Sequence, residues 1–154
     1  MKGYLFILLS GFGMLSCQRN EPATAEHTQL NGTWQLISGT LIEKGDTTTT
    51  DYTRDIQMIK VINDSHFAFL NHDLNKGKDS LAAQFVAGGG RYQLKGDQYT
   101  EHLEYCSDRQ WEGNDFVFKV SIQNDTLTQQ GTEKIEGTTI DRLNIEKYVR
   151  VERR

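Results

Sequence analysis

The chain has 154 residues, of which 36% are hydrophobic and 25% charged. A chain of this length fits one domain, and its apolar content is too high for a wholly disordered protein and too low for one with several membrane spans. The 17 Lys and Arg residues against 21 Asp and Glu leave a formal net charge of −4, which supplies no broad positive field for a nucleic-acid backbone. We therefore expect one folded domain that does not bind nucleic acid.

The first residues have the pattern of a secretion signal. Lys2 supplies a positive charge, and residues 3–15 form an uncharged, mostly apolar run. This run is shorter than the roughly 20 residues that a helix needs to span a bilayer, but it has the length of the apolar region of a signal peptide. We predict a signal peptide over residues 1–16.

The apolar run ends in Met14, Leu15, Ser16 and Cys17, which resemble the bacterial lipobox, the motif whose cysteine becomes the lipidated first residue of the mature protein. The usual first residue of that motif is Leu rather than Met. The alternative is an ordinary signal peptide that is cleaved nearby, which would give a secreted protein. Lipidation of Cys17 predicts a protein anchored to a membrane of the cell envelope, because each buried CH₂ group contributes ~0.8 kcal/mol. Gln18 is not the Asp that marks inner-membrane retention in enteric bacteria, which favours the outer membrane.

Residues 17–29 contain the only proline of the chain, Pro22, together with small polar residues. This composition predicts a flexible tether, followed by one domain over residues 30–154. The domain has no proline, which permits strands throughout, because proline cannot donate a hydrogen bond to a neighbouring strand. Its one cysteine, Cys106, is either a buried small residue or a free thiol.

Short runs of β-forming residues, separated by turn residues, fill the domain. Turns at residues 63–65, 95–97 and 124–125 join neighbouring runs into hairpins. No stretch keeps a helical period beyond two turns. Eight antiparallel strands in chain order most economically form a closed up-and-down β-barrel, because closure removes exposed sheet edges. The predicted strands cover residues 32–42, 55–62, 66–72, 85–94, 98–105, 115–123, 126–132 and 142–151.

The start of the first predicted strand, Gly32, Thr33 and Trp34, resembles the Gly-x-Trp signature of lipocalins and their calycin relatives. In those barrels the Trp closes one end, and an Arg on the last strand packs across it. Arg150 is the corresponding residue here. The resemblance therefore implies a barrel-closing structural pair of Trp34 and Arg150.

Residues 30–150 are also similar to a family of uncharacterised bacterial lipocalin-like lipoproteins, through residues 88–92, 99–105 and 124–127. This similarity implies an all-β, lipocalin-like barrel in the cell envelope, and it implies no settled activity. The chain lacks the other lipocalin signature, a turn resembling Thr-Asp-x-x-Arg.

Alternation along the first predicted strand places Trp34, Leu36, Ser38, Thr40 and Ile42 on one face. Applied to the other predicted strands, the same alternation predicts which of their side chains face the barrel interior.

Alternation over residues 99–105 places Tyr99, Glu101 and Tyr105 on one face and His102 on the other. If the aromatic face is the interior, Glu101 is a carboxylate inside the barrel, where it needs an ion pair or a ligand. At the open rim, Glu101 would instead be solvated.

Aromatic side chains at alternate positions of several strands can converge on one interior. An eight-stranded barrel is just wide enough to be filled by side chains or to hold one small ligand. The rings either fill the core or line a cavity, and the tyrosine hydroxyls favour a cavity, because a buried hydroxyl needs a partner. The candidate ligand-binding residues are Tyr92, Tyr99, Glu101, Tyr105, Phe67 and Phe69.

The sequence contains no recognisable catalytic or metal-binding motif. His66 and His72 would be ~20 Å apart on an extended strand, too far to share a metal ion. Neither Gly-x-Ser-x-Gly nor His-Glu-x-x-His is present. Residues 88–90 are three glycines inside a predicted strand, where glycines mark a bulge or a bend. We expect no catalytic residue, no metal and no cofactor.

Three functions are compatible with these features. The first is a membrane-anchored, lipocalin-like binding protein for a small apolar or amphipathic ligand in the bacterial cell envelope. The second is a structural or interaction lipoprotein whose barrel is filled and holds no ligand. The third is an enzyme that uses Glu101 as a general base among tyrosine hydroxyls. The interior volume of the barrel distinguishes the first from the second.

Overall fold

A computed structural model describes residues 29–152 of the chain. The predicted signal peptide and the lipidation site at Cys17 lie outside the described residues. The described strands form one antiparallel sheet that closes into a barrel, with one additional strand. The prediction of an eight-stranded up-and-down barrel is confirmed. Within residues 29–152, no helix is long and apolar enough to cross a membrane.

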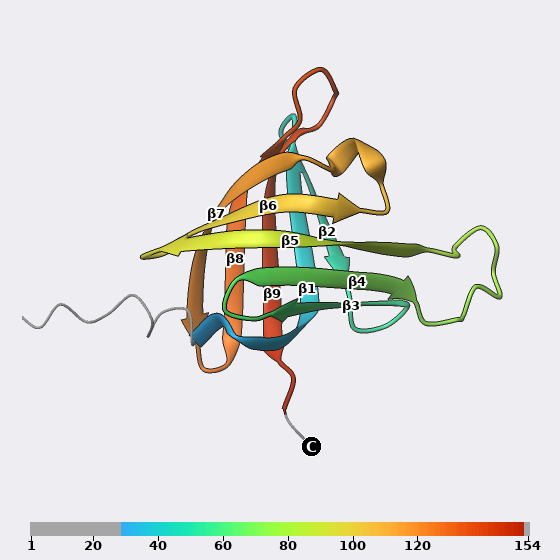
Figure 1. The fold of residues 1–154 in the computed structure, drawn as a ribbon. Helices are drawn as coiled ribbons and strands as arrows, with labels where there is room; N and C mark the ends of the chain where they lie inside the picture. Colours follow the sequence, from blue (N-terminus) through green and yellow to red (C-terminus); the bar gives the residue numbers. More distant parts are fainter. Residues whose placement is uncertain (1–28, 153–154) are drawn as a thin grey trace, which may run out of the picture.

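Each barrel strand pairs with its neighbour in the chain, and the last strand pairs with the first (Figure 1). A short 3-10 helix, η1 (Arg109–Trp111), lies in the connection between β6 and β7. The barrel strands are β1 (Gly32–Glu43), β3 (Ile56–Ile62), β4 (His66–Asp73), β5 (Phe85–Lys95), β6 (Gln98–Cys106), β7 (Asn114–Gln123), β8 (Thr126–Lys134) and β9 (Asp141–Arg150).

The additional strand, β2 (Asp46–Asp51), was not among the predicted strands. It pairs with the second half of β1, while the first four residues of β1 pair with β3. Lys44 and Gly45, both with positive φ, form the turn between β1 and β2. The side chains of β2 are almost all exposed, so the strand has no apolar alternation to predict it.

The pairing of β1 with β9 shifts in register after Leu36. Leu36 is buried in the core, and beyond the shift Leu41 lines the interior. A one-residue shift moves every following side chain to the other face of the sheet. The prediction that Ser38, Thr40 and Ile42 share a face with Trp34 and Leu36 is therefore wrong.

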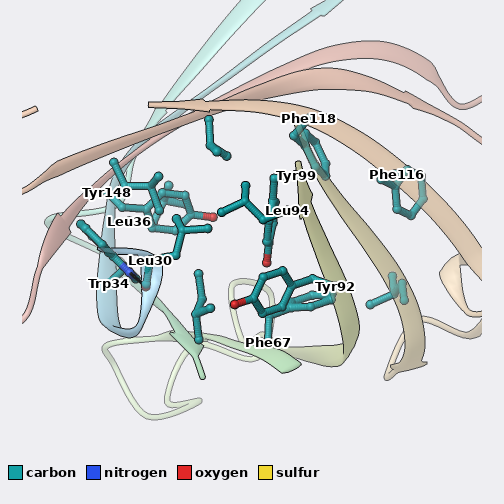
Figure 2. Close-up of a cluster of buried hydrophobic side chains, with 14 of the residues drawn as sticks. Leu30, Trp34, Leu36, Phe67, Tyr92, Leu94, Tyr99, Phe116, Phe118 and Tyr148 are labelled. Carbon is teal, nitrogen blue, oxygen red and sulfur yellow. Dashed lines mark hydrogen bonds between the residues drawn. The ribbon is translucent and has the colours of Figure 1, made fainter. Parts of the chain in front are cut away.

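A hydrophobic core cluster includes Trp34 and extends along the interior of the barrel (Figure 2). Trp34 is completely buried, and its indole Nε1 donates a hydrogen bond to the carbonyl oxygen of Leu30 at 2.8 Å. Leu30 itself is buried below the ring and closes this end. The labelled residues of this core in Figure 2 are Leu30, Trp34, Leu36, Phe67, Tyr92, Leu94, Tyr99, Phe116, Phe118 and Tyr148.

Arg150 covers Trp34 from outside the core. The two residues face each other in the pairing of β1 with β9, and the guanidinium carbon lies 4.0 Å from the centroid of the indole ring. The arrangement that the sequence predicts for Trp34 and Arg150 is present. The β3–β4, β5–β6 and β7–β8 turns gather toward this closed end, and the longer connections lie toward the opposite end (Figure 1).

Candidate functional site

A cavity of about 320 Å³ lies inside the barrel, and several residues of the core cluster line it. Asp108 and Trp111, from the β6–β7 connection, and Tyr52, which follows β2, are among the residues that line it. These segments place the cavity at the end opposite Trp34. Its volume is at the lower limit of the ~300–1,000 Å³ typical of small-molecule sites.

A buried ion pair lies inside the cavity, between Lys60 of β3 and Glu101 of β6. Lys60 Nζ is 2.8 Å from Glu101 Oε1, and the two side chains are only 3% and 8% exposed. Lys60 Nζ also donates a hydrogen bond to Gln129 Oε1 at 3.0 Å, and Glu146 Oε2 lies 4.0 Å away. Glu101 therefore points into the barrel, and Lys60 is the cation that it needs there.

Lys60 and Glu101 each affect the pKa of the other. Burial by itself would lower the pKa of Lys60, but the carboxylates of Glu101 and Glu146 outweigh burial and raise the pKa above its ordinary value. Burial raises the pKa of Glu101, and Lys60 opposes that rise. Lys60 is consequently held as a cation, and the free energy of the pair depends on both partners being present.

A second ion pair lies nearer the mouth. Arg142 Nε donates to Glu133 Oε2 at 2.8 Å, and Asn144 Nδ2 donates to the other carboxylate oxygen of Glu133 at 2.8 Å. The Arg142 guanidinium also lies 5.0 Å from the centroid of the Trp111 ring. Both oxygens of Glu133 are thus occupied by neighbouring side chains.

Unlike Glu101 and Glu133, Glu146 has no cation at hydrogen-bond distance among the described residues. Its Oε2 accepts a hydrogen bond from the Tyr148 hydroxyl at 2.7 Å, and Lys60 Nζ is too far away for a second one. Burial, and then the nearby charge of Glu146, raise the pKa of Tyr148 well above its ordinary value, so the hydroxyl keeps its proton and remains a donor.

Of the predicted ligand-binding residues, Glu101 and Phe69 line the cavity. Phe67, Tyr92 and Tyr99 lie in the packed core instead, where each is almost completely buried (Figure 2). The rings of Tyr92 and Tyr99 are 5.1 Å apart, and the Tyr92 hydroxyl donates to the backbone. These three aromatic residues therefore belong to the core cluster and are not among the residues that line the cavity.

Tyr105 was predicted to share the inner face of β6, and this prediction is wrong. Its side chain is on the outside, with 68% of its surface exposed. The pairing of β5 with β6 shifts between Gly89 and Gly90, so that Glu104 is an extra residue and Cys106 turns inward. The bulge reverses the alternation just before Tyr105.

The glycines of β5 make this bulge possible. A Cβ atom on Gly90 would lie 2.0 Å from the carbonyl oxygen of His102, and one on Gly88 would lie 2.6 Å from the ring of Phe69. Both distances exclude a side chain, so the glycine run allows β6 and the Phe69 ring to approach the backbone closely.

The sequence did not single out Lys60, Gln129, Glu133, Arg142 or Glu146. A signal was available for Lys60, which alternates with the apolar Met58 and Ile62 along a predicted strand. Such a position predicts a buried lysine, and a buried lysine predicts a buried acid.

His66 and His102 have their side chains on the outer surface of the barrel. His102 Nδ1 is 2.7 Å from Asp115 Oδ1, and His66 is bonded to Ser65. Within residues 29–152, no three His, Cys, Asp or Glu side chains are grouped so as to hold a metal ion.

Comparison with known families gives one match. Residues 29–154 match the family described as a domain of unknown function, DUF4488. The matched residues include every strand of the barrel. Comparison with curated proteins gives no match.

Proposed function

The chain belongs to the DUF4488 family of domains of unknown function, and we propose from its barrel interior that it is a lipocalin-like protein that binds a small amphipathic ligand. The cavity of about 320 Å³ carries this proposal. Protein interiors are normally close-packed, and a barrel of eight strands can be filled by side chains alone. An interior cavity of this size therefore supports a binding protein over a filled structural barrel.

The chemistry of the lining supports an amphipathic ligand. Phe69, Leu103 and Phe116 supply apolar wall, while Lys60 and Glu101 supply a buried polar group. Binding sites of this kind combine a mainly apolar lining with a few polar groups that fix the orientation of the ligand. A ligand with an apolar body and one polar end would match both parts.

The binding of a neutral, apolar fluorescent dye, N-phenyl-1-naphthylamine, tests the proposal. Val86 lines the cavity, so Val86→Trp should fill part of it and reduce dye binding at least several-fold. Val117→Trp is the matched control, because Val117 is half exposed on the outside of β7 and its replacement should leave binding unchanged. Equal dye binding by the wild type and both variants would show that the dye does not enter the cavity and would contradict the proposal.

We further propose that acyl chains on Cys17 anchor the barrel to the outer membrane of the cell envelope. The Leu15, Ser16 and Cys17 sequence at the end of a short apolar run supports this. Radiolabelled palmitate should enter the wild-type protein, and Cys17→Ser should release the protein from the membrane fraction. Absence of label in the wild type would contradict the anchor and leave the binding proposal intact.

A further inference from the structure

The charges that line the cavity do not balance. Among the described residues of the lining, Lys60 and Arg142 are the two cations. The carboxylates of the lining are those of Glu101, Asp108, Glu133 and Glu146. Four carboxylates against two cations leave an excess of two negative charges around the cavity.

Direct pairing identifies which carboxylate is left over inside. Lys60 contacts Glu101, and Arg142 contacts Glu133, each at 2.8 Å. Glu146 has only the Tyr148 hydroxyl as a hydrogen-bond donor among the described residues, and its side chain is 14% exposed. A carboxylate that lines a partly apolar cavity is stabilised by a cation in direct contact. Among residues 29–152, the nearest cation to Glu146 is Lys60, whose Nζ lies 4.0 Å away and is in closer contact with Glu101.

A polar group beside Glu146 is also left without a partner. Gln129 is only 2% exposed and pairs with Glu146 across β8 and β9. Lys60 has only donors, so the amide oxygen of Gln129 must face it, as the 3.0 Å hydrogen bond shows. The amide nitrogen of Gln129 then remains at the cavity lining with no acceptor among the described residues. The Gln129 amide, which can donate, and the Glu146 carboxylate, which can accept, thus lie on neighbouring strands in the lining of the cavity.

Part of the cavity wall is aromatic. Tyr52, Phe69 and Trp111 line the cavity. Burial, followed by the charge of Glu146, raises the pKa of Tyr52, which places that ring within the electric field of the carboxylate. Aromatic faces attract cations, and the attraction increases when the cation is removed from water.

We propose that the ligand is a small organic amine, bound as its ammonium cation with Glu146 as the counterion and the aromatic walls around its apolar body. This inference rests on the proposed function and deepens it. The cavity volume limits the ligand to a small molecule, and the Gln129 amide favours an amine that also carries an oxygen acceptor.

Calorimetric titration with three probes of one shape tests the inference. 2-Phenylethylamine is a cation at neutral pH, 2-phenylethanol is neutral, and 3-phenylpropionate is an anion. The amine should bind at least about 10-fold more tightly than the alcohol, and the anion should bind most weakly, because a charged hydrogen bond is stronger than a neutral one. An alcohol that binds as tightly as the amine would overturn the inference.

The variant Glu146→Gln keeps the shape and removes the charge. It should weaken amine binding about 10-fold and leave alcohol binding unchanged, which also shows that the variant is folded. Glu136→Gln is the matched control, because Glu136 is 88% exposed outside the cavity. Unchanged selectivity in Glu146→Gln would overturn the inference while the proposed function stands. If none of the three probes binds and the apolar dye does not bind either, both the inference and the proposed function are overturned.

Discussion

The guanidinium of Arg150 lies over the ring of Trp34, 4.0 Å from its centroid, and donates hydrogen bonds to the carbonyl oxygens of Asn31 at 2.9 Å and Gln29 at 2.7 Å. One side chain of the last strand therefore holds both the first strand and the segment before it. Gly32 leaves room for this arrangement, since a Cβ atom there would lie 2.8 Å from Arg150 Nη1. The closed end of the barrel depends on these contacts.

Trp34→Ala should lower the free energy of unfolding by ~3–5 kcal/mol, as expected for a buried aromatic residue. Arg150→Ala should cost less, because a cation–π contact contributes ~0.5–2 kcal/mol. A double-mutant cycle, measured by urea unfolding, should show a coupling above about 0.5 kcal/mol. If the two losses simply add, the contact contributes nothing to stability.

The Lys60 and Glu101 pair should be sensitive to removal of one partner. Lys60→Met leaves Glu101 buried without a cation in contact and should cost ~3–5 kcal/mol at neutral pH. The double variant Lys60→Met with Glu101→Gln should cost less than Lys60→Met alone, because no buried charge is left unpaired at this position. Urea unfolding of both variants measures the difference, and equal stability of the two would contradict the role of the pair.

The cost of Lys60→Met should also depend on pH. Burial already raises the pKa of Glu101 in the presence of Lys60, and loss of the lysine raises it further. Above the ordinary glutamate pKa of 4.5, the unfolded chain ionises this carboxyl freely while the folded protein resists ionisation. The variant should therefore lose stability relative to the wild type as pH rises from about 4.5 to neutrality. A cost that is the same at both pH values would exclude this mechanism.

Two buried tyrosines should respond in opposite ways to removal of their hydroxyls. The Tyr148 hydroxyl donates to the Glu146 carboxylate at 2.7 Å, whereas the Tyr99 hydroxyl is near Glu101 but makes no hydrogen bond of normal geometry. Tyr148→Phe should cost ~1.5–3 kcal/mol, and Tyr99→Phe should be neutral or stabilising, because an unsatisfied buried hydroxyl is unfavourable. Chemical unfolding of the two variants checks this, and an equal loss in both would contradict it.

Gly90 and Gly96 provide a matched pair of glycine positions. Gly90→Ala should cost at least ~1–3 kcal/mol, because its Cβ would overlap the carbonyl oxygen of His102. Gly96 has a φ of +60° with open space around it, so Gly96→Ala should cost only the ~1–2 kcal/mol of left-handed backbone strain. Only Gly90→Ala should perturb the amide resonances of β6 in a heteronuclear NMR spectrum. An unperturbed β6 would show that the close approach can be relieved.

The strands and the closed end follow from local sequence, but the faces of two strands do not. Alternation predicts buried Trp34 and Leu36 correctly because these residues precede the register shift in β1. It fails at Tyr105 because the bulge in β6 comes just before that residue. The glycine run at residues 88–90 indicates a bulge or a bend at this strand pair, but it does not show that the extra residue is Glu104 of β6, which is set by the pairing of the two strands.

Of the buried pair of Lys60 and Glu101, only Glu101 was predicted from the sequence. Glu101 shares a face with Tyr99, which indicates an inward carboxylate. Its partner Lys60 is 41 residues away in the chain, and only the closure of the barrel brings the two together. The sequence did not predict β2 either, because its exposed threonines leave no apolar pattern.

The central claim is that the half of the barrel opposite Trp34 holds a ligand. The most direct measurement is native mass spectrometry of the protein purified from its own cells, compared with the mass of the denatured chain. We predict an additional mass that is lost on denaturation, that corresponds to a molecule small enough for a cavity of about 320 Å³, and that is reduced in Val86→Trp but retained in Val117→Trp. Identical native and denatured masses, together with no dye binding by the wild-type protein, would contradict the claim.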